Sequence, residues 1–191
     1  MQTKFISILL LSLFLVACVT QPSPKILVSL SDNQTLDFAG KGAAAGIMLD
    51  SVMGGAGIAI GIAIDKGIAK DIANNLSHHE PLLNIADHLD RKLKAAIIKN
   101  RVKGLKNIQA TIEHYGFKTF SGGEDAASAW LEISLLIDGN KFDIYYPHDF
   151  DQVSSASLSS VKQNPDAAYT LLDNATNRVV ERIIENITKS K

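Results

Sequence analysis

Two stretches of the chain place apolar residues at the spacing of an α-helix with one buried face. The first begins at Pro81, a favoured first helical residue, and Gly104 can end it. The second begins at Pro165, with Asn164 as its N-cap. The apolar positions are Leu82, Ile85, Leu89, Leu93, Ala96 and Ile97 in the first stretch, and Leu172, Ala175, Val179, Ile183 and Ile187 in the second. This pattern predicts two amphipathic helices.

Strands are predicted where short apolar runs are bounded by turn residues. Residues 129–137 are such a run, and the Asp138-Gly139-Asn140 turn connects them to a second strand at 141–146. Alternation along the second strand places Tyr145 and Tyr146 on opposite faces, one buried and one exposed. A shorter strand is expected at residues 25–30.

Residues 105–120 fit two patterns. Ile108, Ala110 and Ile112 alternate with polar residues, as in a strand, whereas Leu105, Ile108, Ile112 and Tyr115 also follow a helical spacing. The alternation favours a strand. The serine-rich residues 154–160 are expected to form a loop.

A different pattern occupies the start of the chain. The cation Lys4 precedes an apolar run from Phe5 to Val16, and the small residue Ala17 follows. This is the layout of a secretory signal. The run has about a dozen residues, whereas a spanning helix needs roughly 20. Residues 1–17 are therefore predicted to be a cleaved signal peptide.

The end of this segment, Leu15-Val16-Ala17-Cys18, resembles the lipobox of bacterial lipoproteins. The resemblance implies that Cys18 becomes the first mature residue and carries a covalent diacylglycerol and an N-acyl chain such as palmitate. Cys18 is the only cysteine, so it cannot form an internal disulfide. Val19 stands where many inner-membrane lipoproteins have Asp, which implies an outer-membrane location on the periplasmic side. The inner membrane and the cell surface remain alternatives, as does a secreted protein in which Cys18 is incidental.

Residues 40–67 hold eight of the thirteen glycines, and residues 51–64 carry no charge. Four of the glycines form two pairs with the small-xxx-small spacing that lets helix backbones approach closely: Gly42 with Gly46, and Gly57 with Gly61. We expect these four to make close helix contacts. The segment resembles the glycine-zipper stretches of several small outer-membrane lipoproteins.

This glycine-rich segment allows two structures. A charge-free helix over residues 51–64 would be about 21 Å long, against a hydrocarbon core of about 30 Å. Extending it back to Ala43 would bring Asp50 into the apolar region, at a cost of roughly 2.5–3.5 kcal/mol. The segment is therefore either a helical hairpin that turns near Gly54-Gly55 and packs on the domain, or a membrane-associated segment.

Together these elements predict an α+β fold. Two amphipathic helices pack on a small antiparallel sheet, preceded by the glycine-rich hairpin or membrane-associated segment. The expected organisation is a signal peptide (1–17), a lipid-anchored tether (18–39), a glycine- and alanine-rich apolar segment (40–76) and a periplasmic domain (77–191). The mature chain would carry a net charge of about −2, because the signal removes one cation from a chain of net charge −1. This balance gives no electrostatic basis for binding nucleic acid.

The sequence shows no catalytic or metal-binding pattern. His78, His79 and His88 are close in sequence but lack the usual spacing of zinc ligands. Neither His114 nor His148 is tied by sequence to a nucleophile, and no Gly-x-Ser-x-Gly motif is present. We therefore expect no enzyme activity, no metal, and no cofactor apart from the covalent lipid on Cys18.

The sequence predicts a lipid-anchored envelope protein with a structural, assembly or partner-binding role. Its expected partners are the membrane, a second copy of the chain or another envelope protein. Two alternatives remain: a membrane-active or pore-forming protein that uses residues 43–64, and an envelope ligand-binding or hydrolytic domain.

Overall fold

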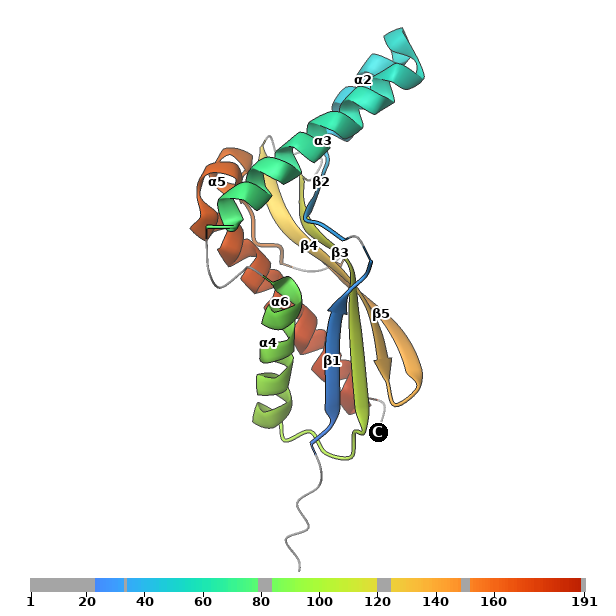
Figure 1. The fold of residues 1–191 in the computed structure, drawn as a ribbon, viewed down its shortest axis with the longest axis vertical. Coiled ribbons are helices and arrows are strands. Elements are labelled where there is room, and N and C mark those ends of the chain that lie inside the picture. The colour runs from blue at the N-terminus through green and yellow to red at the C-terminus, as the bar shows by residue number, and fades with distance from the viewer. Residues whose placement is uncertain (1–22, 33, 79–83, 120–124, 149–151, 190–191) are drawn as a thin grey trace, which may run out of the picture.

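The computed structural model describes residues 23–32, 34–78, 84–119, 125–148 and 152–189. Its elements, in chain order, are β1 (Lys25–Leu30), β2 (Asp37–Ala39), α2 (Lys41–Met53), α3 (Gly55–Leu76), α4 (Ile85–Lys99), β3 (Asn107–Thr119), β4 (Ala126–Ile137), β5 (Asn140–Tyr146), β6 (Ala156–Ser157), α5 (Leu158–Gln163) and α6 (Pro165–Lys189). The described residues thus form a mixed α/β structure with five helices and a six-stranded sheet (Figure 1).

The sheet is mixed, so the prediction of an antiparallel sheet is wrong. β3, β4 and β5 form an antiparallel meander, whereas β1 and β2 both pair in parallel with β3. These two strands lie in the segment assigned to a tether (18–39), and that assignment is too long because residues 25–30 and 37–39 belong to the sheet. Parallel neighbours need a long crossover. Here the crossover contains α2, α3 and α4.

β3 changes phase at a bulge between Ile112 and His114, which pair with Ile133 and Glu132 of β4. A bulge adds one residue to one strand and so exchanges its inward and outward positions. Even-numbered residues up to Ile112 point into the core, whereas Phe117 is fully buried beyond the bulge. The prediction of a strand within residues 105–120 is confirmed.

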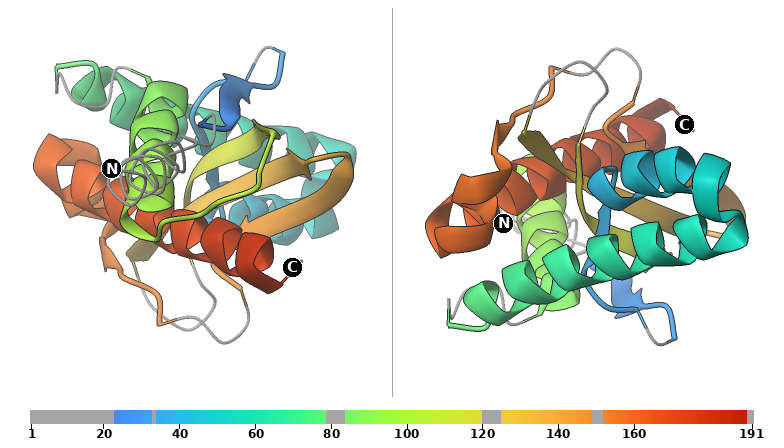
Figure 2. Two further views of the ribbon diagram at one scale, coloured as in Figure 1. Left: turned by 90° about the horizontal axis from the view of Figure 1, so that it is seen from below. Right: turned by 90° about the horizontal axis from the view of Figure 1, so that it is seen from above.

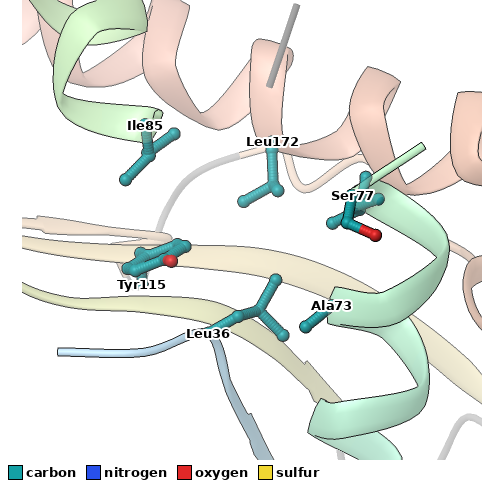
Figure 3. A pocket seen from close by; sticks show the side chains of 7 residues that line it. Leu36, Ala73, Ser77, Ile85, Tyr115 and Leu172 are labelled. Carbon is teal, nitrogen blue, oxygen red and sulfur yellow. The ribbon is translucent and has the colours of Figure 1, made fainter. Parts of the chain in front are cut away.

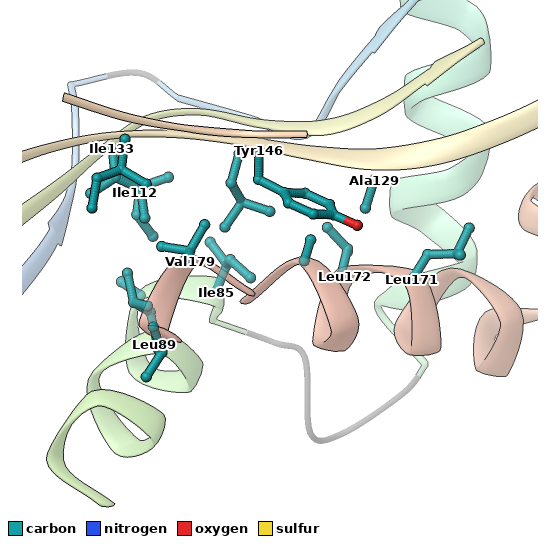
Figure 4. Packing of buried hydrophobic residues seen from close by; sticks show 14 of the residues in the cluster. Ile85, Leu89, Ile112, Ala129, Ile133, Tyr146, Leu171, Leu172 and Val179 are labelled. Carbon is teal, nitrogen blue, oxygen red and sulfur yellow. The ribbon is translucent and has the colours of Figure 1, made fainter. Parts of the chain in front are cut away.

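The amphipathic helices α4 and α6 pack on one face of the sheet (Figure 2). Figure 4 shows the core between them, where Leu89 of α4 and Val179 of α6 lie near Ile112 and Ile133 of the sheet. On β5, Tyr146 is buried and Tyr145 is exposed. The predicted division of these two tyrosines between opposite faces is confirmed.

Several element boundaries differ from the prediction; β4, for example, begins at Ala126 instead of residue 129. α4 begins at Ile85, because the Asn84 side chain accepts hydrogen bonds from the first turn, and it ends at Lys99, before Gly104. Pro81 lies outside the described residues. The serine-rich stretch contains β6 and α5 in addition to loop, since the Ser157 side chain caps α5. α6 begins at Pro165 as predicted.

The molecule is elongated, and its two ends are formed by different parts of the chain (Figure 1). β1 starts at the lower end of the long axis. The connection between α2 and α3 lies at the upper end, beyond the sheet.

Candidate contact surface on the α2–α3 pair

One end of α3 is embedded in the domain and the other projects from it (Figure 1). Near the C-terminal end, Ile72 and Leu76 are buried in the core. The Asn75 side-chain amide donates a hydrogen bond to the carbonyl oxygen of Lys162 in α5. The Lys162 ammonium also lies 3.0 Å from the Asp71 carboxylate. The projecting part of α3 therefore extends from a fixed base.

The four glycines selected from the sequence lie where α2 and α3 run side by side (right view of Figure 2). A Cβ atom at Gly42 would overlap the carbonyl oxygen of Gly61. A Cβ atom at Gly61 would overlap the Gly42 carbonyl in turn and lie 2.9 Å from Gly46 Cα. One at Gly57 would overlap the backbone of Asp50. Since these positions face a helix of the same chain, they are not open to a second chain.

Asp65 of α3 holds the start of α2. Its carboxylate accepts hydrogen bonds from the backbone N–H groups of Gly40, Gly42 and Ala43 at 3.3, 2.6 and 3.3 Å. The first N–H groups of a helix have no partner within the helix, and a carboxylate there also complements the helix dipole. Sequence analysis missed this role of Asp65, because its partners are 22 to 25 residues away.

Beyond Asp65 the α2–α3 pair exposes large apolar side chains. We call residues 47–64 the apolar tip. Its exposed large side chains are Ile47, Met48, Val52, Met53, Ile58, Ile60, Ile62 and Ile64. Val52 is 83% exposed and Met48 is 77% exposed. Asp50 is the one charged residue of the tip.

These apolar side chains surround the helices instead of forming one stripe. Along α3, isoleucines recur every second residue from Ile58 to Ile64, which turns successive side chains by about 200° around the helix axis. A helix that is apolar all round is typical of a buried environment, in a large core or in lipid. Large exposed apolar patches on folded proteins often mark interaction sites. None of the helices in the described ranges is long and apolar enough to cross a membrane.

A separate polar cluster joins α4 to α6. Asp173 Oδ1 lies 2.8 Å from both His88 Nε2 and Lys92 Nζ. Burial lowers the pKa of His88, although the hydrogen bond to Asp173 acts in the opposite direction. The neutral imidazole then donates its Nε2–H to the carboxylate. Burial acts to raise the pKa of Asp173, but the hydrogen bond and charge of Lys92, together with His88, lower it overall. The cluster links the two helices.

The other histidines named from the sequence lie apart. His114 stacks on Trp130, with ring centroids 5.7 Å apart, and its Nδ1 is 3.6 Å from the Asp37 carboxylate. His148 lines a surface hollow beside Tyr145. Across the parts of the chain that the structure describes, no group of three or more His, Cys, Asp or Glu side chains is placed to hold a metal ion.

An apolar cavity of about 160 Å³ lies between the helices and the sheet (Figure 3). Leu36, Tyr115 and Leu172 are among its lining residues. Pockets for small-molecule ligands usually measure about 300–1,000 Å³. Burial raises the pKa of the Tyr115 hydroxyl, and the nearby charge of Asp37 adds to this effect. At about 160 Å³, this cavity is smaller than a usual ligand site.

Cys18, the predicted lipidation residue, lies outside the described residues, as does His79. Comparison of the chain with protein-family models, curated proteins and solved structures gives no match.

Proposed function

We propose that this chain is a lipid-anchored cell-envelope protein with a structural or assembly role. In this proposal the α2–α3 pair is a glycine-packed helical hairpin that serves as its contact surface. The lipobox-like Leu15-Val16-Ala17-Cys18 supports a diacylglycerol and an N-acyl chain on Cys18. Val19 supports attachment to the outer membrane, on the periplasmic side. The proposed role is non-enzymatic: the α2–α3 pair makes contacts while the lipid holds the chain at the membrane.

The observation that carries this proposal is the exposure of the apolar tip. Removing apolar surface from water contributes roughly 25 cal/mol per Å². Met48, Val52 and their apolar neighbours are exposed to water, so a contact that covers them would be favourable. Because α3 is fixed at its base by Ile72 and Leu76, the tip is presented on a stable support.

The position of the anchor supports action close to a membrane. Seven residue steps separate Cys18 from Lys25, where β1 begins. An extended chain spans at most about 3.6 Å per residue, so the domain would start within about 25 Å of the lipid. Such attachment raises the effective concentration of the domain at the membrane, and weak contacts then become populated.

The test uses the full chain in a bacterial host supplied with a palmitate analogue. We expect label on the wild type, an N-terminus at Cys18 by mass spectrometry, and recovery in the outer-membrane fraction. Cys18→Ser should remove the label, and Val19→Asp should keep the label but move the protein to the inner membrane. A wild-type protein that is unlabelled, or that retains residues 1–17, would contradict the proposal.

A further inference from the structure

We infer that the apolar tip inserts into one leaflet of a lipid bilayer, with the lysines at its base lying among the headgroups. This inference rests on the proposed use of the α2–α3 pair as a contact surface, but it does not require a lipid on Cys18. It identifies the partner of the tip as the bilayer itself.

The distribution of the apolar side chains favours lipid over a protein partner. In α2, Ile47, Met48 and Met53 lie at about 100°, 200° and 340° around the helix from Gly46, which faces α3. Ile58 and Ile60 of α3 lie at about 100° and 300° from Gly57. A protein partner covers one side of a helix pair, whereas acyl chains surround it. The tip therefore fits a uniformly apolar medium.

The length of the tip fits one leaflet. From Gly55 to Ile64, α3 rises about 14 Å. The hydrocarbon core of a bilayer is about 30 Å thick. A tip of this length reaches no further than the middle of the bilayer, as in proteins that attach to one leaflet.

The charges at the base of the tip fit an anionic lipid surface. Lys66 and Lys70 are exposed and follow the apolar part of α3 after Asp65, whose carboxylate is bonded to the start of α2. Lysine side chains can place their apolar stems along a membrane surface and their ammonium groups among phosphates. Inside the tip, Asp50 is exposed four residues before Gly54 and opposes insertion, because a carboxylate in the apolar region is unfavourable. Removing the charge of Asp50 should therefore strengthen insertion into the bilayer.

The experiment measures vesicle binding by the mature chain with Cys18→Ser, which carries no acyl chain. The vesicles contain phosphatidylethanolamine and phosphatidylglycerol. The tip variant is Met48→Ser/Val52→Ser, and the matched control is Leu27→Ser/Ile98→Ser, whose residues are 52% and 77% exposed on β1 and α4. We expect the tip variant to lower the partition coefficient about a hundredfold. The control should change it less than about twofold.

The two charge changes should have opposite effects. Asp50→Asn should strengthen binding. Lys66→Gln/Lys70→Gln should weaken it about fivefold per lysine on these vesicles, and have little effect on phosphatidylcholine alone. Because Cys18 is the only native cysteine, a single polarity-sensitive dye can then be placed at Val52→Cys or Ile98→Cys. The dye should shift to the blue on vesicle addition at position 52 and stay unchanged at position 98.

Three results would overturn the inference. The first is no vesicle binding by the parent chain, and the second is an equal loss of binding in the tip variant and the control. The third is release of an entrapped dye, which would indicate a pore instead of insertion into one leaflet. Light scattering without vesicles tests whether the partner is a second copy of the chain. If the parent chain forms a soluble oligomer that dissociates in the tip variant, and does not bind vesicles, the tip is a surface for self-association. Loss of palmitate labelling in the full chain would contradict the Cys18 anchor and leave these results unaffected.

Discussion

Replacing single glycines of α3 by alanine tests the close contact between α2 and α3. Gly61→Ala places a methyl group against the Gly42 carbonyl and within 2.9 Å of Gly46 Cα. Gly67→Ala is the matched control on the same helix, because no heavy atom lies within 4 Å of its added Cβ. The two variants differ in their surroundings but not in chemistry.

The expected magnitudes follow from helix propensity and packing. Alanine favours a helix interior over glycine by about 1 kcal/mol, so Gly67→Ala should stabilise α3 by about that amount. Gly61→Ala gains the same propensity but forces two backbones apart, and overpacking usually costs about 1–3 kcal/mol. The two variants should therefore differ by about 1–3 kcal/mol in the free energy that holds α2 on α3.

Hydrogen exchange of the α2 peptides, followed by mass spectrometry, measures this difference directly. We expect faster exchange in Gly61→Ala than in Gly67→Ala, by roughly 5- to 150-fold, because 1.4 kcal/mol corresponds to tenfold. Global unfolding in urea should change less, since the contact lies outside the core. Equal exchange of α2 in the two variants would refute the close contact at Gly61.

The remaining predictions concern Asp65 and His88. Asp65→Ala removes the acceptor of three N–H groups at the start of α2 and should destabilise that helix by about 1 kcal/mol, seen as faster exchange, whereas Asp65→Asn keeps one acceptor oxygen and should lose less. Acid should reduce the free energy of unfolding: the pKa of His88 is lowered in the fold, so below pH 6.5 the unfolded chain binds more protons, and the loss grows until the pH reaches the folded pKa. The lowered pKa of Asp173 adds a further loss near and below pH 3.8. His88→Gln can still donate to Asp173 but does not titrate, so urea unfolding followed by Trp130 fluorescence should depend less on pH between about 7.5 and about 5.5; an unchanged slope would argue against a buried neutral His88.

The sequence predicted those elements whose pattern is local. α6, β4 and β5 follow from periodicity and turn residues within one stretch of chain. The ambiguity at residues 105–120 has a physical cause in the bulge after Ile112. The inward positions shift there from even to odd numbers, so Ile112 and the cavity-lining Tyr115 are three residues apart. A bulged strand then resembles a helix over a short window.

Contacts between distant parts of the chain could not be predicted from the sequence. The parallel pairing of β1 with β3 joins residues about eighty positions apart, such as Lys25 and Asn107, and no local pattern encodes it. The glycine spacing identified the residues of a close contact, but the same spacing serves contacts within one chain and between chains. The structure places Gly42 against Gly61 of the same chain. The isoleucines between Ile58 and Ile64 are exposed to solvent. The lipid on Cys18 stays a prediction.

The opposite positions of β1 and the apolar tip limit how the molecule can be oriented at a membrane. β3 is about 43 Å long, and α2, which is itself about 20 Å long, begins beside the end of β3. The segment of at most about 25 Å before Lys25 is too short to bring a lipid on Cys18 to the tip. A doubly attached molecule therefore has two arrangements: its long axis lies flat along one bilayer, or it stands between two bilayers about its own length apart. With lipidated protein, the first arrangement leaves vesicles dispersed and the second clusters them, so vesicle turbidity reports which arrangement the molecule adopts.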